Sequence, residues 1–504
     1  MKIIVKPIEL DSAKADLIIV GIFEGYLLSE TAEKLNELSR GELLRLMKRA
    51  NFQAKIGQGL PIFQLKNTAF EFLLLIGCGK REELSFSKFR QIMQTTMKSI
   101  KFYRVKSAAC YLTELKLQEP NPVKIRLMTT SVYDALYTFN ALKSEPESPS
   151  PLSSMIIHLP EKSQQKACNE AVREAIGIAQ GMQLAKDLAN LPSNICTPTY
   201  LAQEAERLAK AFKSVSTQIL DEKAMRKLKM GGILAVSQGS QEEAKLIALS
   251  HHGANKKQAP IVLIGKGITF DTGGNSIKPA DSMLGMKYDM CGGAAVMGVI
   301  KSCAALNIPI NVVGIIAAVE NMPGGSAFKP DDVITTMSGK TIEIISTDAE
   351  GRLVLADALT YCARFRPEVV IDIATLTGAV VIALGVHTAG LWSNHDPLAS
   401  DLIKAGQESN DRVWLMPLFD EYQEQLKSTI ADMSNVGGRA AGAITAACFL
   451  SRFAKTYQWA HIDIAGTVGM VGNDRMATGR PVPLLIQYLI NRSQMNRSDQ
   501  KHAR

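Results

Sequence analysis

The sequence lacks the short motifs that mark several common classes of metal and nucleophile enzymes. No two of its eight cysteines form a Cys-x-x-Cys pair, and neither His-Glu-x-x-His nor Gly-x-Ser-x-Gly occurs. A zinc peptidase of the two-histidine helix type is therefore excluded, as is a serine hydrolase built on a nucleophile elbow. Cysteines scattered through apolar runs are typical of reduced, mostly buried thiols, so we expect neither disulfides nor structural zinc.

A long apolar run is also missing. The longest, residues 373–386, includes two threonines and two glycines, and a membrane-spanning helix needs about 20 apolar residues. Charged residues interrupt every apolar patch of residues 1–23, which predicts two strands and not a signal peptide. We therefore expect a soluble, cytoplasmic protein with no membrane partner.

The overall composition indicates an ordinary globular protein of more than one domain. The chain has 504 residues, 46% of them hydrophobic and 21% charged, and a single core rarely serves a chain of this length. The net charge of +8 permits mild attraction to nucleic acid. No arginine-rich arm or aromatic RNA-binding motif accompanies it, so a solvated surface is the simpler interpretation.

Alternating strand-like and helix-like segments predict two α/β domains. Residues 1–165 form the smaller N-terminal α/β domain, whose expected strand ends hold no cluster of titratable residues. A Pro- and Ser-rich stretch at 143–151 breaks the pattern, and a long helix over 163–188 is expected to connect the domains. Residues 166–490 are predicted to be a larger C-terminal α/β catalytic domain with a central, mostly parallel sheet, and 491–504 a polar tail. Its expected strands are 261–265, 310–319, 341–346 and 368–376.

Two short segments of the second domain concentrate the charged residues that could carry chemistry. Each of these residues lies beside a glycine or turn-forming residue at the end of an apolar run, where an open α/β sheet presents groups to a ligand. The set comprises four carboxylates (Asp271, Asp289, Asp348 and Glu350), two lysines (Lys266 and Lys278) and one arginine (Arg352).

Each segment also has a plainer interpretation. If residues 348–350 are extended, Asp348 and Glu350 project to the same side; as an alternative, both acids simply cap the following helix. The glycine-rich loop after Lys266 could be a solvated turn or a phosphate cradle. The dinucleotide fingerprint fails because Phe270 takes the place of its third glycine, and the Walker pattern fails at Ile334.

Metal binding explains more of this set than phosphate binding does. Carboxylates are hard oxygen ligands suited to Mn, Mg or Zn, and four of them can serve two ions only if some bridge. A lysine ligates a metal only when deprotonated, which neighbouring cations can achieve by lowering its pKa. None of the seven histidines lies in either segment.

Other candidate residues have weaker claims. The His251–His252 pair is predicted to be a strand-end feature, and Cys291, without a nearby histidine, a packed core residue. Met283, Met286 and Met290 are compatible with helix core or with an apolar wall for a substrate side chain.

Several motifs of the second domain, in order, resemble the leucyl aminopeptidase family (cytosol aminopeptidases). The resemblance covers residues 185–490, and the N-terminal domain is compatible in length but carries no motif. Ser346 stands where the family usually has Asn, a position that is not a metal ligand there, so an altered hydrogen bond is expected. The motifs are VLIGKGITFDTGGNSIKPADSMLGMKYDMCGGAAV, TDAEGRLVLADAL, DIATLTGA, SNVGGRAAGAITAACFL, WAHIDIAGT and ATGRPVPLL.

The resemblance implies a role for each charged residue. One divalent ion, Mn or Zn, would be held by Lys266, Asp271, Asp289 and Glu350. A second would be held by Asp271, Asp348 and Glu350. Lys278 would stabilise the oxyanion of the tetrahedral intermediate. Arg352 would hold a bicarbonate that acts as general base.

The resemblance also implies substrate and assembly. The substrates would be peptides with a free N-terminus, favouring leucine and other apolar residues, and the chain would form a homohexamer. A DNA-binding role as a hexamer and a dipeptidase of Cys-Gly type are the alternatives. The pocket for the first side chain would be lined by Met286, Thr375, Leu376 and Gly378.

Overall fold

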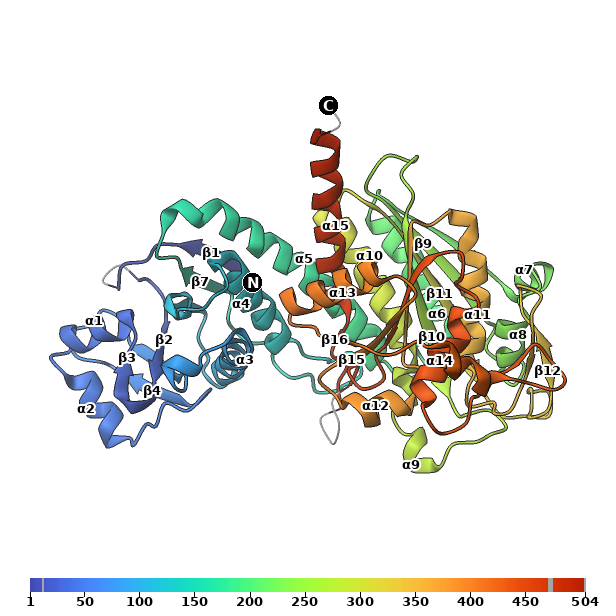
Figure 1. The fold of residues 1–504 in the computed structure, drawn as a ribbon. Coiled ribbons are helices and arrows are strands. Elements are labelled where there is room, and N and C mark those ends of the chain that lie inside the picture. The colour runs from blue at the N-terminus through green and yellow to red at the C-terminus, as the bar shows by residue number, and fades with distance from the viewer. Residues whose placement is uncertain (11–12, 470–474, 503–504) are drawn as a thin grey trace. The chain divides into compact units, whose positions relative to one another are not determined.

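The computed structural model describes residues 1–10, 13–469 and 475–502 (Figure 1). The chain divides into two compact units, Met1–Ala179 and Gln180–Arg504, and helix α5 (Gln165–Asn190) continues across the division. The Pro-rich stretch at 143–151 has no regular structure, as its composition predicts.

The first unit is a sheet covered by helices on both faces. Its strand order is β1-β7-β6-β2-β5-β4, with β3 paired to β2, and all neighbours in that order are parallel except β4. Helices α3, α4 and the start of α5 pack on one face, and α1 and α2 on the other. The strands are β1 (Lys2–Lys6), β2 (Leu17–Phe23), β3 (Leu27–Leu28), β4 (Gly59–Phe63), β5 (Phe72–Gly77), β6 (Ser107–Cys110) and β7 (Ser154–His158). The helices are α1 (Glu30–Leu38), α2 (Glu42–Arg49), α3 (Phe86–Phe102) and α4 (Asn121–Leu136).

Three elements of this unit, β3, helix α4 and strand β4, were not predicted from the sequence. Helix α4 is rich in β-branched residues, which weaken the helical signal, and its apolar positions do not form a clear stripe. Strand β4 contains Pro61, which normally argues against a strand, but β4 lies at the edge of the sheet, where proline is tolerated.

The second unit is built on an eight-stranded sheet with the order β16-β15-β18-β14-β10-β11-β9-β8. The four central strands β18, β14, β10 and β11 are parallel, and antiparallel pairs lie on both sides of them. This confirms the predicted two-domain α/β class with a parallel sheet centre. The strands are β8 (Val215–Leu220), β9 (Lys245–His252), β10 (Ile261–Asp271), β11 (Asn311–Asn321), β14 (Val369–Ala374), β15 (Ala389–Ser393), β16 (Val413–Leu415) and β18 (Gln458–Asp463).

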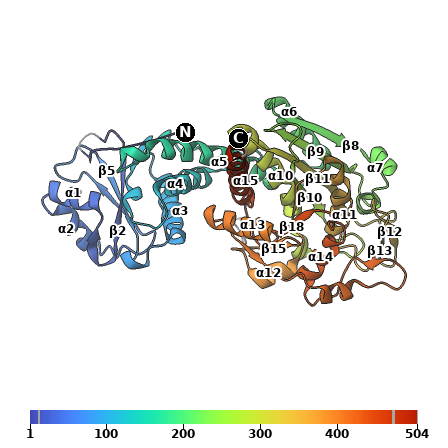
Figure 2. The same cartoon turned by 45° about the horizontal axis from the view of Figure 1, so that its top comes forward.

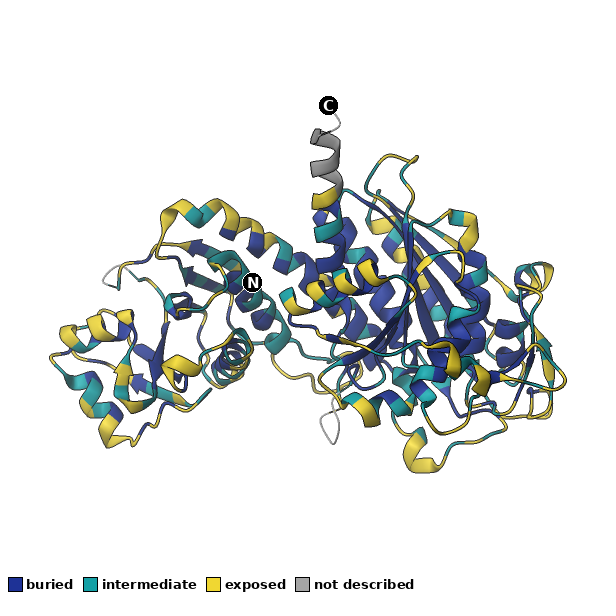
Figure 3. Ribbon diagram, in the orientation of Figure 1, coloured by how far each residue is buried: buried dark blue, intermediate teal, exposed yellow. Residues whose placement is uncertain are grey.

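Helices bury both faces of this sheet, which is why its central strands are almost continuously apolar. Helices α6, α10, α13 and α15 pack on one face, and α8, α11 and α14 on the other (Figure 2). In Figure 3 the central strands carry the colour of buried residues, and the helices against them carry it on part of their length. Those helices are α6 (Pro198–Ala211), α8 (Gly231–Ser237), α10 (Cys291–Leu306), α11 (Gly351–Tyr361), α13 (Asp396–Glu408), α14 (Gly442–Ser451) and α15 (Val482–His502).

The segment 341–346, predicted as a strand of the parallel sheet, belongs to another sheet. Strand β13 (Thr341–Glu343) pairs with β12 (Val333–Thr335) and β17 (Met433–Ser434) in a separate three-stranded sheet. That part of the prediction was wrong, because strand propensity is local whereas sheet membership depends on distant pairing partners.

One helical stretch of the described residues, Met286–Leu306, is long and apolar enough to cross a membrane by length and composition. Within the most apolar 18 residues of this stretch, 89% are buried inside the protein, as in a core helix. All eight cysteines are free and buried, as their positions in apolar runs predicted.

Candidate functional site

The charged residues singled out in the sequence meet at the carboxyl end of strand β10. Lys266 and Asp271 lie on β10 itself, and Lys278 lies in the loop that follows. Asp289 belongs to the short 3-10 helix η6 (Met286–Met290), which leads into α10. Glu350 directly precedes helix α11. The structure therefore brings these residues together at the end of a strand, as the sequence predicted.

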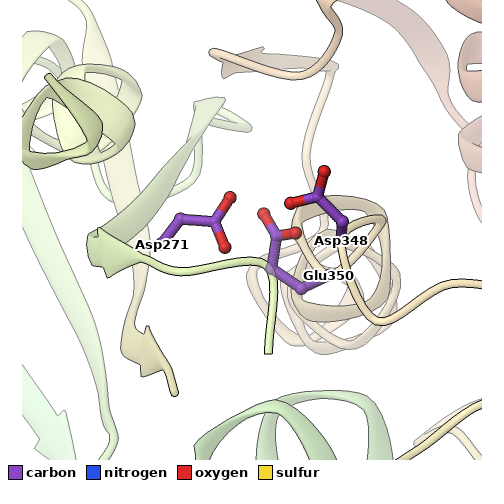
Figure 4. Close-up of side chains that lie close together, drawn as sticks. All are labelled: Asp271, Asp348 and Glu350. Carbon is purple, nitrogen blue, oxygen red and sulfur yellow. The ribbon is translucent and has the colours of Figure 1, made fainter. Parts of the chain in front are cut away.

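Three of the four carboxylates form a tight cluster. One oxygen each from Asp271, Asp348 and Glu350 lies within 4.8 Å of the others. Figure 4 shows their carboxylates pointing toward one another, with Asp271 coming from a different segment than Asp348 and Glu350. The fourth, Asp289, is linked to Glu350 by the Lys266 ammonium, which lies 2.8 Å from an oxygen of each.

The two lysines divide the carboxylates between them. Lys266 is buried and also donates a hydrogen bond to the Thr375 carbonyl at 2.9 Å. Lys278 is partly buried; it lies 2.8 Å from Asp271 Oδ2 and also pairs with Asp348. The two ammonium groups offset only part of the negative charge of the four carboxylates.

Two opposing effects set the pKa values of these groups: burial disfavours the charged form of each group, and neighbouring groups of opposite charge favour it. Burial lowers the pKa of Lys266, but Asp289, Glu350 and Asp271 outweigh it and leave that pKa above its ordinary value. A neutral amine at Lys266 therefore requires additional cations, as the sequence argument assumed. Burial raises the pKa of Asp348 to about 6, and Lys278 opposes this rise. Burial likewise raises the pKa of Asp289, against the opposing effect of Lys266.

The local structure around Asp348 and Glu350 corrects one prediction. Thr347 and Asp348 lie in a turn and Glu350 has helical backbone angles, so residues 348–350 are not an extended strand. The two carboxylates converge because the turn brings them together. The capping alternative also fails for Glu350, which occupies the N-cap position of α11 without a side-chain capping hydrogen bond.

A close approach of α10 to the sheet brings Asp289 to Lys266. A Cβ atom on Gly292 would lie 2.2 Å from the Ile373 carbonyl oxygen and 2.9 Å from the backbone nitrogen of Lys266. Only glycine allows the start of α10 to pack this closely. Asp289, three residues earlier, is thereby held beside the Lys266 side chain.

Arg352 is held by a residue that sequence reasoning missed. Its Nη1 donates to the Asn435 carbonyl at 2.7 Å, and its buried Nε has no hydrogen-bond partner among the described residues. Burial lowers the pKa of Arg352 to about 10, so it remains cationic at neutral pH. The Asn435 side chain also accepts from the Ile345 amide at 2.8 Å and donates to the Ser346 carbonyl at 2.6 Å.

Ser346, the departure from the family pattern, makes a local hydrogen bond. Its hydroxyl accepts from the Asp348 amide at 3.2 Å, which helps to form the turn before Glu350. The Ser346 hydroxyl therefore acts on the backbone of the carboxylate segment, and a change relative to Asn stays a prediction.

Of the four predicted pocket residues, Thr375 bonds directly to a charged residue of the site, whereas Leu376 bonds to the neighbouring Asp463. The Thr375 hydroxyl donates to Asp289 Oδ1 at 2.6 Å, and the Leu376 amide donates to Asp463 Oδ1 at 3.1 Å. Met286 opens the η6 helix that contains Asp289, and Gly378 is exposed at the start of α12 (Gly378–Leu384). The placement of Met286 and Gly378 in a substrate pocket continues to rest on the resemblance.

Asp463 and Asn321 are two further buried residues that the sequence argument did not single out. Asp463 accepts the Leu376 and Ala465 amides and the Thr377 hydroxyl, and so holds the loop after β14. Asn321 donates to Asp271. Asp463 lies in the WAHIDIAGT motif, and that motif could have identified it as a candidate residue. Asn321 follows a predicted strand, and no motif around it marked it as a candidate.

Divalent metal ions fit this set of groups. The carboxylate oxygens of three residues converge within 4.8 Å, and hard oxygen ligands suit Mn²⁺, Mg²⁺ or Zn²⁺. Glu350 Oε2 is buried and has no hydrogen-bond partner among the described residues. Buried carboxylate oxygens are normally paired or metal-bound, so an unpaired one in this cluster favours a cation site.

The histidine pair and Cys291 occupy the places that the sequence predicted, a strand end and the packed core. His251 is the last residue but one of strand β9, is buried, and shares a 3.0 Å hydrogen bond with the Ile308 carbonyl. His252 is exposed beside it and contacts Ser216 at 3.0 Å. Cys291 is buried at the start of α10.

Comparisons with known proteins agree over both units. The family model described as "Cytosol aminopeptidase family, catalytic domain" matches residues 183–486, and its "N-terminal domain" counterpart matches residues 19–146. A probable cytosol aminopeptidase of Thioalkalivibrio sulfidiphilus is 50% identical over 96% of this chain and 98% of its own length. One of Nitrosococcus oceani is 50% identical over 95% of this chain and 96% of its own.

Two solved structures are similar to this chain over nearly its whole length. A tomato leucine aminopeptidase mutant matches with a TM-score of 0.87 and 30% identity, covering 97% of this chain and 96% of its own. The bottromycin maturation enzyme BotP in complex with Mn matches with a TM-score of 0.83 and 29% identity, covering 95% of this chain and 100% of its own.

Proposed function

The chain belongs to the cytosol aminopeptidase family, and from this premise we propose that it removes N-terminal residues from peptides with two divalent metal ions. Aminopeptidase activity is the common property of the family and of its relatives. The observation that carries the two-metal proposal is the convergence of four carboxylates and two lysines at one strand end.

Each ion would have its own set of residues, with two carboxylates shared. Lys266, Asp271, Asp289 and Glu350 would hold one ion, and Asp271, Asp348 and Glu350 the other. The family is metal-dependent and the similar BotP structure contains Mn, which supports Mn²⁺ as a first ion to test. Bound ions of this kind polarise a carbonyl and lower the pKa of water.

Lys278 and Arg352 would act on the substrate without holding metal. Lys278 carries a cationic ammonium beside Asp271 and Asp348, where it can stabilise negative charge on the carbonyl oxygen. In hydrolysis the water oxygen bonds to the carbonyl carbon, the C–N bond breaks and the leaving amine takes a proton. Arg352 would hold a bicarbonate as the proton acceptor, and its unpaired, buried Nε supports an anion partner.

We propose a preference for leucine and other apolar N-terminal residues. Met286, Thr375, Leu376 and Gly378 would line the pocket for that side chain. The substrate's free α-amine would bind at the metal centre, which restricts cleavage to the N-terminus.

Metal removal combined with a substrate panel tests this function. Leucine amide should be hydrolysed, activity should vanish after chelation, and Mn²⁺ or Zn²⁺ should restore it. N-acetyl-leucine amide, which has no free amine, should resist cleavage. Full activity of the metal-stripped protein would refute the two-metal proposal, and a strong preference for Cys-Gly would replace the leucine preference by the dipeptidase alternative.

The homohexamer is proposed from the family resemblance, and apolar surface on the second unit supports association. Trp414 and Leu415 lie on β16, an edge strand of the large sheet, and Phe419 follows shortly after. Their exposed fractions are 64%, 45% and 64%, and exposed apolar groups of this kind commonly mark association surfaces. Light scattering on the purified 54.8 kDa chain should give six times the chain mass; a monomer would refute the assembly.

DNA binding remains a second candidate because of a basic stretch in the first unit. Residues 84–113 contain six lysines and arginines and no Asp or Glu. Four of these cations, Lys98, Lys101, Arg104 and Lys106, are exposed. A gel-shift titration at several salt concentrations tests it: binding that weakens steeply with salt supports the role, and no binding at low salt removes it.

A further inference from the structure

A single buried amide group joins the two segments that carry the carboxylate cluster. Asn321, the last residue of β11, is completely buried. Its Nδ2 donates to Asp271 Oδ1 at 2.8 Å and to the Thr347 carbonyl at 3.0 Å. Asp271 ends β10, whereas Thr347 immediately precedes Asp348. The Asn321 side chain therefore connects the end of β10, which carries Asp271, with the segment that carries Asp348 and Glu350.

The position of Asn321 is fixed by its own strand. It pairs with Asp271 in the parallel β10–β11 register. Its carbonyl accepts from the Thr272 amide at 3.0 Å and from the Thr272 hydroxyl at 2.8 Å. Gly274 packs so closely that a Cβ there would lie 2.8 Å from Asn321 Oδ1. With its backbone held and its side chain enclosed, Asn321 offers its amide donors from a rigid position.

The hydrogen bond from Asn321 helps to fix the orientation of the Asp271 carboxylate. Asp271 Oδ1 accepts from Asn321 Nδ2 and also from the Gly273 amide at 2.9 Å. The other oxygen, Oδ2, lies 2.8 Å from the Lys278 ammonium. One oxygen is thus engaged by neutral donors of the scaffold, and the other is directed at the cationic side of the site.

The second bond of Asn321 holds the turn that presents Asp348 and Glu350. Thr347 is also interlocked with the glycine-rich loop: its hydroxyl donates to the Gly273 carbonyl at 2.5 Å and accepts from the Ser276 amide at 2.7 Å. Asn321 is the member of this network that reaches both the Asp271 carboxylate and the Thr347 backbone.

We propose that Asn321 is a positioning residue of the metal centre, orienting Asp271 and the 347–350 turn so that their carboxylates converge on the same ions. This role rests on the proposed two-metal function. Residues that orient metal ligands by hydrogen bonding commonly change metal affinity about 10–100-fold when they are replaced. We expect an effect of that size on Mn²⁺ affinity when the Asn321 amide is removed.

The same strand supplies a matched control. Asn311 begins β11 and is also buried. Its Nδ2 likewise donates twice, to the Asn255 carbonyl at 2.8 Å and the Gln258 carbonyl at 3.0 Å. All these partners belong to a loop at the opposite end of the strand, roughly 30 Å from Asn321 at about 3.3 Å per residue. Asn311→Ala therefore removes a comparable buried amide without touching the site.

The test is Mn²⁺ binding by isothermal titration to the metal-free full-length protein, with melting temperatures measured in parallel. Asn321→Ala should lower the affinity for Mn²⁺ by about 10–100-fold, whereas Asn311→Ala should lower the melting temperature but bind Mn²⁺ as the wild type does. Asn321→Ser, which keeps one hydroxyl donor, is measured as well and serves alone if the alanine variant does not fold; it too should bind Mn²⁺ more weakly than the wild type.

Three results would overturn this role. Wild-type Mn²⁺ affinity and stoichiometry in the Asn321 variants would show that the amide does not orient the ligands. An equal loss of affinity in Asn311→Ala would show that the effect is a general consequence of a weakened strand. A wild-type protein that binds neither Mn²⁺ nor Zn²⁺ would refute the proposed two-metal function, and the Asn321 role with it.

Discussion

Gly351 begins helix α11 directly against Lys266, and Gly351→Ala should therefore disturb the site more than the fold. A Cβ atom at this position would lie 2.7 Å from Lys266 Cε, 2.8 Å from Nζ and 2.9 Å from Cδ. Carbon atoms in contact rest about 3.5–4.0 Å apart, so the lysine side chain has to retreat by about 1 Å. The Nζ atom, now 2.8–2.9 Å from Asp289, Glu350 and the Thr375 carbonyl, would then lose at least one of these contacts.

The expected cost to stability is small because two effects of Gly351→Ala oppose each other. Overpacking a buried site costs about 1–3 kcal/mol, and replacing glycine by alanine in a helix returns up to about 1 kcal/mol. The free energy of unfolding should therefore fall by about 0–3 kcal/mol, and the protein should remain folded. Catalysis is far more sensitive, since a displacement of about 1 Å at a reacting site can cost on the order of 100-fold in rate.

The assay is kcat/KM for leucine amide, measured with the melting temperature and the bound metal content. Gly442→Ala is the matched control, because Gly442 also begins a helix and its Cβ would meet only the Ala379 Cβ at 3.4 Å, an ordinary contact. The control should retain wild-type kcat/KM, whereas Gly351→Ala should lose about 100-fold. A Gly351→Ala protein with wild-type kcat/KM and metal content would refute the argument that Lys266 must stay in its present position.

Three other expectations follow from individual contacts. Lys278→Ala should lower kcat by about 100–1,000-fold while two metal ions per chain remain bound; loss of metal would make Lys278 a ligand instead. Asp463→Asn keeps an acceptor for the Leu376 and Ala465 amides and should stay close to wild-type kcat/KM, whereas Asp463→Ala should lose about tenfold or more; equal losses would mean that charge and not geometry matters. Burial raises the pKa of Asp357 to about 7 from 3.8, so the folded protein holds a proton that the unfolded chain releases, and the unfolding free energy falls as pH rises from about 4 to about 7. Urea unfolding at pH 5 and pH 8 should show the unfolding free energy of the wild type falling relative to that of Asp357→Asn as pH rises; a constant difference between the two proteins would contradict it.

The charged residues of the site could be predicted because each lies in a short contiguous motif at the end of an apolar run. The residues that hold them could not. Asn321 is a single asparagine after a strand, and its two partners are a carboxylate 50 residues earlier and a carbonyl 26 residues later. Asn435 and Asp463 lie within motifs that carried the family resemblance, but nothing local indicated that they hold Arg352 and the loop after β14.

The sequence by itself determined the two-domain α/β class, the central strands and helices, and the set of charged groups at the site. These depend on periodicity and on short motifs, which are local properties of the chain. Only the tertiary structure decided that residues 341–343 leave the main sheet, that a turn and not an extended strand brings Asp348 and Glu350 together, and that Lys266 and Lys278 pair with different carboxylates. Those outcomes depend on contacts between segments far apart in the chain, and side-chain spacing along one segment carries no information about the other.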